Sequence, residues 1–250
     1  MERIIREFYD NYISSGEYEK KYPYPNPYVL NIILKILSKR SFVLDAGCGN
    51  GRYLIPLAME GYKISGIDIS GRMLSNLYSR IKLNNVSADV VLGDIRDLSI
   101  KNECVDAVIC LFGVLSHIQG SSNRDKALSE FYRVLKPQGT LIVSVPNKYR
   151  RFFKEQILSK LNSHLADGIL YKRNFDSISF YHLYSATELY RALSQNNFKE
   201  ITIIGESLIT ECFSIKNKCK LLKSIERVFL SSRISQFISY NLLAIAKKEG

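Results

Sequence analysis

The stretch Phe42-Val43-Leu44-Asp45-Ala46-Gly47-Cys48-Gly49-Asn50-Gly51 decides the fold of this 250-residue chain. Its apolar start predicts a buried strand over Phe42–Asp45, and the glycines that follow predict a tight turn into a helix. In open sheets covered by helices, ligands bind outside the carboxyl ends of the strands. Glycine lets backbone amides approach such a ligand without obstruction from a Cβ atom. The stretch therefore predicts a ligand site at the end of this strand.

The spacing of the glycines indicates what kind of ligand the turn accepts. Dinucleotide-binding turns read G-x-G-x-x-G, whereas this one reads D-x-G-x-G-x-G, with Gly51 one residue early. A carboxylate at Asp45 repels a pyrophosphate and suits a ligand that carries an ammonium group. A dehydrogenase is therefore disfavoured.

Short strand patterns alternate with helical ones on both sides of this turn, which predicts a parallel sheet covered by helices. Four further runs rich in Val, Ile and Leu have the character of strands buried on both faces: Lys63–Asp68, Ala88–Leu92, Val105–Leu111 and Thr140–Val145. A helix is expected over Ser122–Leu135, with Ser122 as its cap and Asp125 completing a capping box. Other helices are expected over Pro27–Ser38, Arg52–Glu60, Gly71–Leu83, Thr187–Gln195 and Leu221–Leu230.

Acidic residues close two more of the predicted strands. Asp68 lies 19 residues after Gly49, the distance at which a carboxylate meets a ribose diol. Asp94 follows the third strand and can accept a hydrogen bond from an adenine amino group. Three apolar side chains are placed to sandwich the adenine ring: Ile69, Ile95 and Leu111. Carboxylates at three successive strand ends predict one nucleoside site that also holds a positive charge.

These motifs together resemble the class I S-adenosylmethionine-dependent methyltransferases, over residues 42–147 in order. The matching stretches are DAGCGNG, GIDIS, GDIRDL, CVDAVICLFGVLSHI and FYRVLKPQGTLIVSVPN. The resemblance implies that Asp45 and Gly47 hold the methionine portion of S-adenosylmethionine, with Gly49 beside it. It implies that Asp68 binds the ribose, Asp94 and Ile95 the adenine, and that Leu111 closes the pocket.

The resemblance also implies the fold. We expect an α/β, Rossmann-like sheet of seven mostly parallel strands with helices on both faces and a helical cap insertion. The last strand, Asn241–Lys247, is expected to run antiparallel beside Lys199–Gly205. The whole chain, 1–250, is expected to be a single domain of this kind.

A methyl group carried on a sulfonium is already activated, so catalysis is largely positioning and desolvation. A base is needed only when the acceptor carries a proton near the transition state. His117 lies where an acceptor should enter, and it is our candidate catalytic residue for orienting or deprotonating it. A structural loop histidine is the alternative interpretation. No cluster of histidines and carboxylates has metal-ligand spacing, so no metal is expected.

The acceptor has two interpretations, and the first is RNA. The formal charge of +11 comes from two segments: 147–173 carries a net +5 and 213–250 a net +6. Clustered Lys and Arg attract phosphates. The stretches GCGNGRYL and FYHLYSATELYRAL resemble the tRNA wobble-uridine carboxymethyl methyltransferases. That branch implies a carboxylate acceptor on a modified uridine and a small zinc-containing activator protein as partner.

The second interpretation is a small acceptor, of the quinone type or another metabolite. The Tyr- and Phe-rich segment 1–40 would then form a helical lid, and the insertion 147–183 a cap. Aromatic residues at this density also stack on bases or build a core. A basic helical insertion is expected over 207–238. A third reading, a non-catalytic partner subunit, is disfavoured because Asp45, Asp68 and Asp94 are all present.

The chain has no apolar run near the roughly 20 residues that cross a bilayer, so no membrane association is expected. Its five cysteines form no C-x-x-C pair. A disulfide framework is therefore not expected, and the cytoplasm is the natural compartment.

Overall fold

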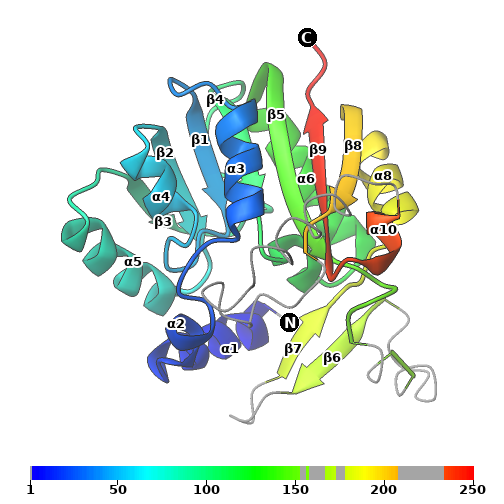
Figure 1. The fold of residues 1–250 in the computed structure, drawn as a ribbon, viewed down its shortest axis with the longest axis horizontal. Helices are drawn as coiled ribbons and strands as arrows, with labels where there is room; N and C mark the ends of the chain where they lie inside the picture. Colours follow the sequence, from blue (N-terminus) through cyan, green and yellow to red (C-terminus); the bar gives the residue numbers. More distant parts are fainter. Residues whose placement is uncertain (1, 153–155, 158–166, 173–177, 208–233) are drawn as a thin grey trace, which may run out of the picture.

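The computed structural model describes residues 2–152, 156–157, 167–172, 178–207 and 234–250. Within these residues the core is a seven-stranded sheet in the order β3-β2-β1-β4-β5-β9-β8 (Figure 1). Its strands are β1 (Phe42–Ala46), β2 (Lys63–Asp68), β3 (Asp89–Leu92), β4 (Val105–Cys110), β5 (Leu135–Pro146), β8 (Lys199–Gly205) and β9 (Asn241–Lys247). β1 to β5 pair in parallel, whereas β9 is antiparallel to both β5 and β8. The expected fold class, with its antiparallel last strand, is confirmed.

Helices cover both faces of the sheet because each presents an apolar stripe to it. One face carries α3 (Pro27–Ile36), α4 (Leu54–Met59) and α5 (Gly71–Leu83), and the other carries α6 (Ser121–Val134) and α8 (Ala186–Gln195). The side chains of Ile33, Leu57 and Leu77 are fully buried on the first face. Phe131 and Leu189 are fully buried on the second.

The start of α6 differs from the prediction. The helix begins at Ser121 with Gly120 as its N-cap, at φ +84°, and no side chain caps it. The capping box expected from Ser122 and Asp125 is therefore wrong, because the chain enters the helix two residues earlier through a conformation that suits glycine. A capping box does form at α8. There the Ser185 hydroxyl accepts from the Glu188 amide at 3.2 Å, and the Ser185 amide donates to the Glu188 carboxylate at 2.8 Å.

Two N-terminal helices lie beyond the carboxyl ends of the parallel strands, at the bottom of Figure 1. They are α1 (Glu2–Ser14) and α2 (Glu17–Lys21). The third helix of the predicted lid 1–40 has a different place. α3 packs on the sheet through Val29 and Ile33, whose side chains are inaccessible to solvent. Only the first two helices are therefore positioned over the strand ends.

The predicted cap insertion 147–183 contains a two-stranded antiparallel sheet, β6 (Ile169–Lys172) and β7 (Ile178–Tyr181). The expectation of a helical cap is corrected for these residues, because the two strands pair from Ile169 opposite Tyr181 to Lys172 opposite Ile178, and Ile169, Phe180 and Tyr181 are buried. The hairpin lies below the sheet beside α1 (Figure 1). Residues 153–155, 158–166 and 173–177 of the insertion lie outside the described residues.

Most of the basic helical insertion predicted over 207–238, including the helix Leu221–Leu230, also lies outside the described residues. Its described end forms the short helix α10 (Ser235–Ile238), which packs against β8. In the described part of the chain, none of the helices has the length and apolar character needed to span a membrane.

Candidate functional site

A cavity of about 480 Å³ opens where the carboxyl ends of β1, β2, β3 and β4 meet α1 and α2. Each of the nine residues selected from the sequence lines it. They are Asp45, Gly47, Gly49, Asp68, Ile69, Asp94, Ile95, Leu111 and His117. Parallel strands place their ends at the same edge of the sheet, so residues distant in the chain converge there.

The glycine-rich turn holds its shape through backbone hydrogen bonds. The amides of Gly47 and Cys48 both donate to the Ile67 carbonyl, at 2.8 and 3.0 Å. Gly51 has φ +82°, and a Cβ atom there would overlap the side chain of Leu77 on α5. Glycine is therefore required at this position by both conformation and packing.

Gly49 leaves open space at the cavity. Its φ is +52°, and a Cβ atom added there would meet only the Met73 sulfur at 3.9 Å and the Tyr18 hydroxyl at 4.0 Å. A side chain there would therefore take up space in the cavity. A ligand can approach the backbone closely at this point.

Asp45 is an almost fully buried carboxyl, with 3% of its surface exposed. Burial first, and the nearby charge of Asp68 second, raise the pKa of Asp45 to about 8. The ionised carboxylate is therefore unfavourable in the ligand-free site. A cation in the cavity would stabilise it.

Asp68 reaches the cavity between two backbone amides. Its carboxylate oxygens accept hydrogen bonds from Gly49 and Ser70, each at 2.8 Å. Burial raises the pKa of Asp68 to about 6, while these amides oppose the rise. The same contacts fix the orientation of the carboxylate, and its remaining lone pairs are available to hydroxyl donors.

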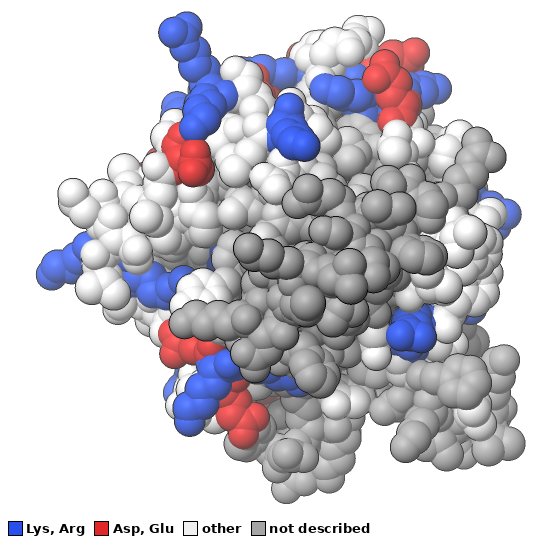
Figure 2. All heavy atoms as spheres, in the orientation of Figure 1, with Lys and Arg blue, Asp and Glu red and all other residues white. Residues whose placement is uncertain are grey.

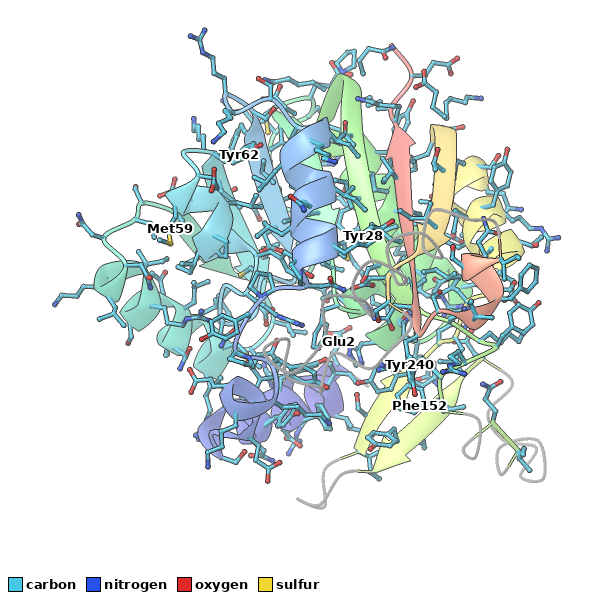
Figure 3. All side chains as sticks on the ribbon, in the orientation of Figure 1. Glu2, Tyr28, Met59, Tyr62, Phe152 and Tyr240 are labelled. Atoms are coloured by element: carbon cyan, nitrogen blue, oxygen red, sulfur yellow. The ribbon has the colours of Figure 1, made fainter. Side chains whose placement is uncertain are left out.

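Asp94 is held by a partner that the sequence reasoning did not foresee. The Arg96 guanidinium contacts both of its carboxylate oxygens, through Nε at 3.0 Å and Nη2 at 2.5 Å. Arg96 also contacts Glu2 at the start of α1, the residue labelled near the centre of Figure 3. The Asp94 carboxylate, which is expected to accept a hydrogen bond from adenine, thus also anchors the N-terminal helix α1 through Arg96.

Further polar contacts fasten α1 across the cavity. The Ser70 hydroxyl donates to the Asp10 carboxylate at 2.5 Å, and Arg72 donates to the Ser14 hydroxyl at 2.8 Å. Ser70 also caps α5, so the helix that follows β2 and the helix that covers the cavity share one contact point. The cavity is therefore closed on this side by α1.

His117 ends the short helix η1 (Val114–His117) and is 7% exposed. Its Nδ1 lies 2.9 Å from the Phe180 carbonyl on β7, which can only accept a hydrogen bond. Nδ1 therefore carries the hydrogen, and Nε2 accepts from the Tyr9 hydroxyl at 2.6 Å. The Tyr181 ring packs on the imidazole with centroids 4.3 Å apart.

Residues outside the predicted cofactor and catalytic set also line the cavity: Tyr9 and Tyr18, which belong to the predicted N-terminal lid, and Arg52 and Phe112, which no motif indicated. Arg52 lies over the Phe112 ring at 4.4 Å, and its Nε donates to the Tyr24 carbonyl at 2.7 Å. The aromatic richness of the N-terminus was visible in the sequence. No motif spacing connected it to the glycine turn, because α1 and α2 reach the strand ends only in the folded chain.

The donor set fits S-adenosylmethionine. The cavity offers two carboxyls with raised pKa values for a cation, the buried Asp45 and the half-buried Asp68, and open backbone at Gly49. Its apolar walls, Ile69, Ile95 and Leu111, suit an adenine ring. Among the described residues, no group of three or more His, Cys, Asp or Glu side chains could hold a metal ion.

Residues 43–139 match the family described as a methyltransferase domain. Among curated proteins, the chain is 31% identical over 173 residues to malonyl-[acyl-carrier protein] O-methyltransferase of Yersinia pestis, covering 66% of this chain and 58% of that protein. It is 36% identical over 113 residues to a tRNA (carboxymethyluridine(34)-5-O)-methyltransferase of Arabidopsis thaliana, covering 45% and 26%. The chain thus spans little more than half of the first relative and about a quarter of the second.

Two solved structures share the fold over nearly the whole chain. A possible histamine N-methyltransferase from Thermotoga maritima, described as S-adenosylmethionine-dependent, has a TM-score of 0.67 at 18% identity, covering 100% of both chains. A Haloferax volcanii complex of the Trm112 methyltransferase activator with a putative methyltransferase has a TM-score of 0.62 at 18% identity, covering 97% and 98%. At such identities the likeness establishes the fold. Residues 43–139 thus match a methyltransferase domain, and the chain has the Rossmann-like fold of these solved structures.

Proposed function

We propose that this chain transfers a methyl group from S-adenosylmethionine to a small acceptor molecule. The single observation that carries the proposal is the enclosure of the cavity by the N-terminal helices. Tyr9 of α1 and Tyr18 of α2 line the same cavity as Asp45 and Asp68. A cavity of about 480 Å³ lies within the range of small-molecule sites.

In this proposal the chain's own residues bind and orient both ligands. Asp45 and Asp68 hold the cationic cofactor. The glycine turn lets the cofactor approach the backbone amides closely. Ile69, Ile95 and Leu111 enclose the adenine ring. When bound, S-adenosylmethionine supplies a methyl group that its sulfonium has already activated. The remaining task of the protein is to exclude water and align the acceptor, which α1 and α2 are placed to do because both line the cavity.

A tRNA acceptor is the second candidate, and two observations favour it. One is the 36% identity to the Arabidopsis tRNA enzyme. The other is the pair of basic residues Arg150 and Arg151. Their guanidinium carbons lie 5.1 and 5.8 Å from the centre of the Tyr240 ring. Tyr240 is labelled beside Phe152 in Figure 3. An activator protein such as the partner in the Haloferax complex belongs to this second candidate.

The visible surface gives this candidate little further support. On the face shown in Figure 2, the described Lys and Arg side chains stand apart from one another, and Asp and Glu lie close to several of them. Much of both basic segments lies outside the described residues. Within the described residues, Lys148 pairs with Glu188 at 3.2 Å rather than remaining available to phosphate.

Methyl transfer from S-adenosylmethionine that carries a radioactive methyl group tests whether the acceptor is a small molecule or RNA. The full chain is incubated separately with total RNA and with the low-molecular-weight fraction of a cell extract. We expect label in the small-molecule fraction and not in RNA. Label in RNA alone would refute the small acceptor. In that case Arg150→Glu with Arg151→Glu should weaken RNA binding and reduce its dependence on salt.

A further inference from the structure

The sequence placed His117 where it could meet the acceptor directly, but in the structure its Nε2 faces the Tyr9 hydroxyl, and Tyr9 lines the same cavity. The imidazole is 7% exposed, and both of its nitrogens already face protein groups. Tyr9 is only half-buried, lines the cavity, and holds its hydroxyl 2.6 Å from Nε2. A ligand in the cavity can therefore exchange a proton with His117 through the Tyr9 hydroxyl.

The environment of the histidine defines its tautomer and prepares it to accept a proton. The Phe180 carbonyl takes the Nδ1 hydrogen, so the lone pair of Nε2 points to Tyr9. The Ser179 hydroxyl lies 3.2 Å from Nδ1, and the Tyr181 ring packs on the imidazole. After protonation the Phe180 carbonyl would still accept from Nδ1, now in a charge-assisted hydrogen bond. The ring does not need to move.

We propose that Tyr9 is the catalytic residue that contacts the acceptor, and that His117 acts through Tyr9 as the base of a proton relay. This inference rests on the proposed function, because it requires a small acceptor in the cavity. The acceptor X–H gives its proton to the Tyr9 oxygen while the phenolic proton passes to His117 Nε2. The new X–CH₃ bond forms as the bond from methyl carbon to sulfur breaks, and the sulfur keeps that electron pair. His117 then loses its proton to solvent.

The relay defines the class of acceptor. A hydroxyl must lose its proton as it is methylated, and a protonated amine must lose one before its lone pair can attack, so both benefit from a base. A carboxylate is already ionised near neutral pH and has no proton to give. We therefore assign the site to an acceptor that is methylated on a hydroxyl oxygen or an amine nitrogen, and not to one that forms a methyl ester.

Tyr9→Phe is the central variant because it removes one hydroxyl and keeps the ring packing against Phe8 and Tyr18. Tyr12→Phe is the matched control. It makes the same chemical change on the same helix, and Tyr12 does not line the main cavity. His117→Asn removes the base and keeps a donor for the Phe180 carbonyl.

The first measurement needs no substrate. Nitrogen NMR of the full chain resolves the imidazoles of its three histidines, and His117→Asn assigns the signal of interest. We expect the neutral Nδ1–H tautomer for His117, and a shift of its Nε2 resonance in Tyr9→Phe but not in Tyr12→Phe. The opposite tautomer, or an Nε2 resonance unchanged by Tyr9→Phe, would overturn the relay.

The second measurement uses the labelled cofactor and the low-molecular-weight extract. We expect Tyr9→Phe to lower kcat about 100-fold, within the range for lost acid–base catalysis, with little change in KM. His117→Asn should lower kcat similarly, and the double variant no further, because the two residues act as a unit. Tyr12→Phe should match the wild type. Cofactor binding measured by calorimetry should be alike in all four.

The labelled product itself is then treated with mild alkali, which releases the methyl group of an ester as volatile methanol and leaves methyl ethers and methylamines intact. Alkali-stable label is expected. Volatile label, or a kcat of Tyr9→Phe equal to that of the wild type, would overturn the relay and leave the proposed function standing. Absence of any labelled small molecule from the wild-type reaction would instead overturn the proposed function, and the relay with it.

Discussion

Replacement of Asp45 by asparagine should stabilise the ligand-free protein, increasingly so as the pH rises. Asp45 is buried, with a pKa raised to about 8 from its ordinary value of 3.8. The unfolded chain ionises this carboxyl near pH 4, whereas the folded chain keeps it protonated up to about pH 8. Between those values the folded state binds the extra proton, so stability falls as the pH rises.

The slope for one proton is about 1.4 kcal/mol per pH unit. Over the roughly three units from pH 5 to pH 8, the wild type should therefore lose about 4 kcal/mol through Asp45 that Asp45→Asn does not lose. Asparagine has a similar shape and no charge to desolvate, so the advantage of the variant should widen with pH by up to this amount. The variant should also bind S-adenosylmethionine more weakly, because the site loses a negative charge.

Urea unfolding of both proteins at four pH values between about pH 5 and pH 8 measures the difference. Asp106→Asn is the control, because Asp106 has a pKa lowered by Lys136 and the Phe42 amide despite partial burial. The ionisation of Asp106 is coupled to folding only below about pH 4. The effect of Asp106→Asn on the free energy of unfolding should therefore stay constant over the tested range. A difference between the wild type and Asp45→Asn that does not vary with pH would refute the reasoning.

Three further outcomes follow from individual contacts. Affinity for S-adenosylmethionine, measured by calorimetry, should fall by at least about tenfold from pH 7 to pH 5, because Asp68, with a pKa of about 6, accepts from hydroxyl donors more strongly as the carboxylate, and Asp45, with a pKa of about 8, must ionise to hold the cation; Asp68→Ala should weaken binding and leave the fold intact, and unchanged affinity would contradict its role. Gly51→Ala should lower the free energy of unfolding by about 2 kcal/mol, since it adds a Cβ at φ +82° against Leu77; an unchanged urea midpoint would contradict this. Arg124→Met should cost about 3 kcal/mol, because it leaves the Asp167 carboxylate without the guanidinium that contacts both its oxygens at 2.9 and 2.7 Å; a loss below about 1 kcal/mol would show that the pair contributes little.

The amino-acid sequence was sufficient to place the strands that build the site. β2, β8 and β9 have the predicted bounds, and β1, β3 and β4 differ by one residue at one end. These strands are short apolar runs bounded by turn residues, so local pattern and burial agree about them. The strand-end carboxylates were predictable for the same reason, because each closes such a run or follows it within two residues.

Local pattern was insufficient at helix starts and in the insertion. Ser122 and Asp125 have the spacing of a capping box, yet α6 begins from Gly120, where the Asp167 carboxylate accepts from the Gly120 amide at 2.6 Å. That contact joins residues 47 positions apart, so no local window contains it. The β6–β7 hairpin likewise depends on packing against α1 and η1.

The sequence by itself determined that one edge of the sheet carries a flexible glycine turn and three carboxylates. Each of these features can be recognised within a short stretch of consecutive residues. It also determined the chemistry that such an edge favours, a cationic nucleoside ligand. Only the tertiary structure decided what closes the site. Tyr9 and His117 are 108 residues apart, and their hydrogen bond exists because α1 folds back over the strand ends while β7 supplies the carbonyl that orients the imidazole. Contacts at such separations depend on how whole elements pack, and no spacing along the chain encodes them.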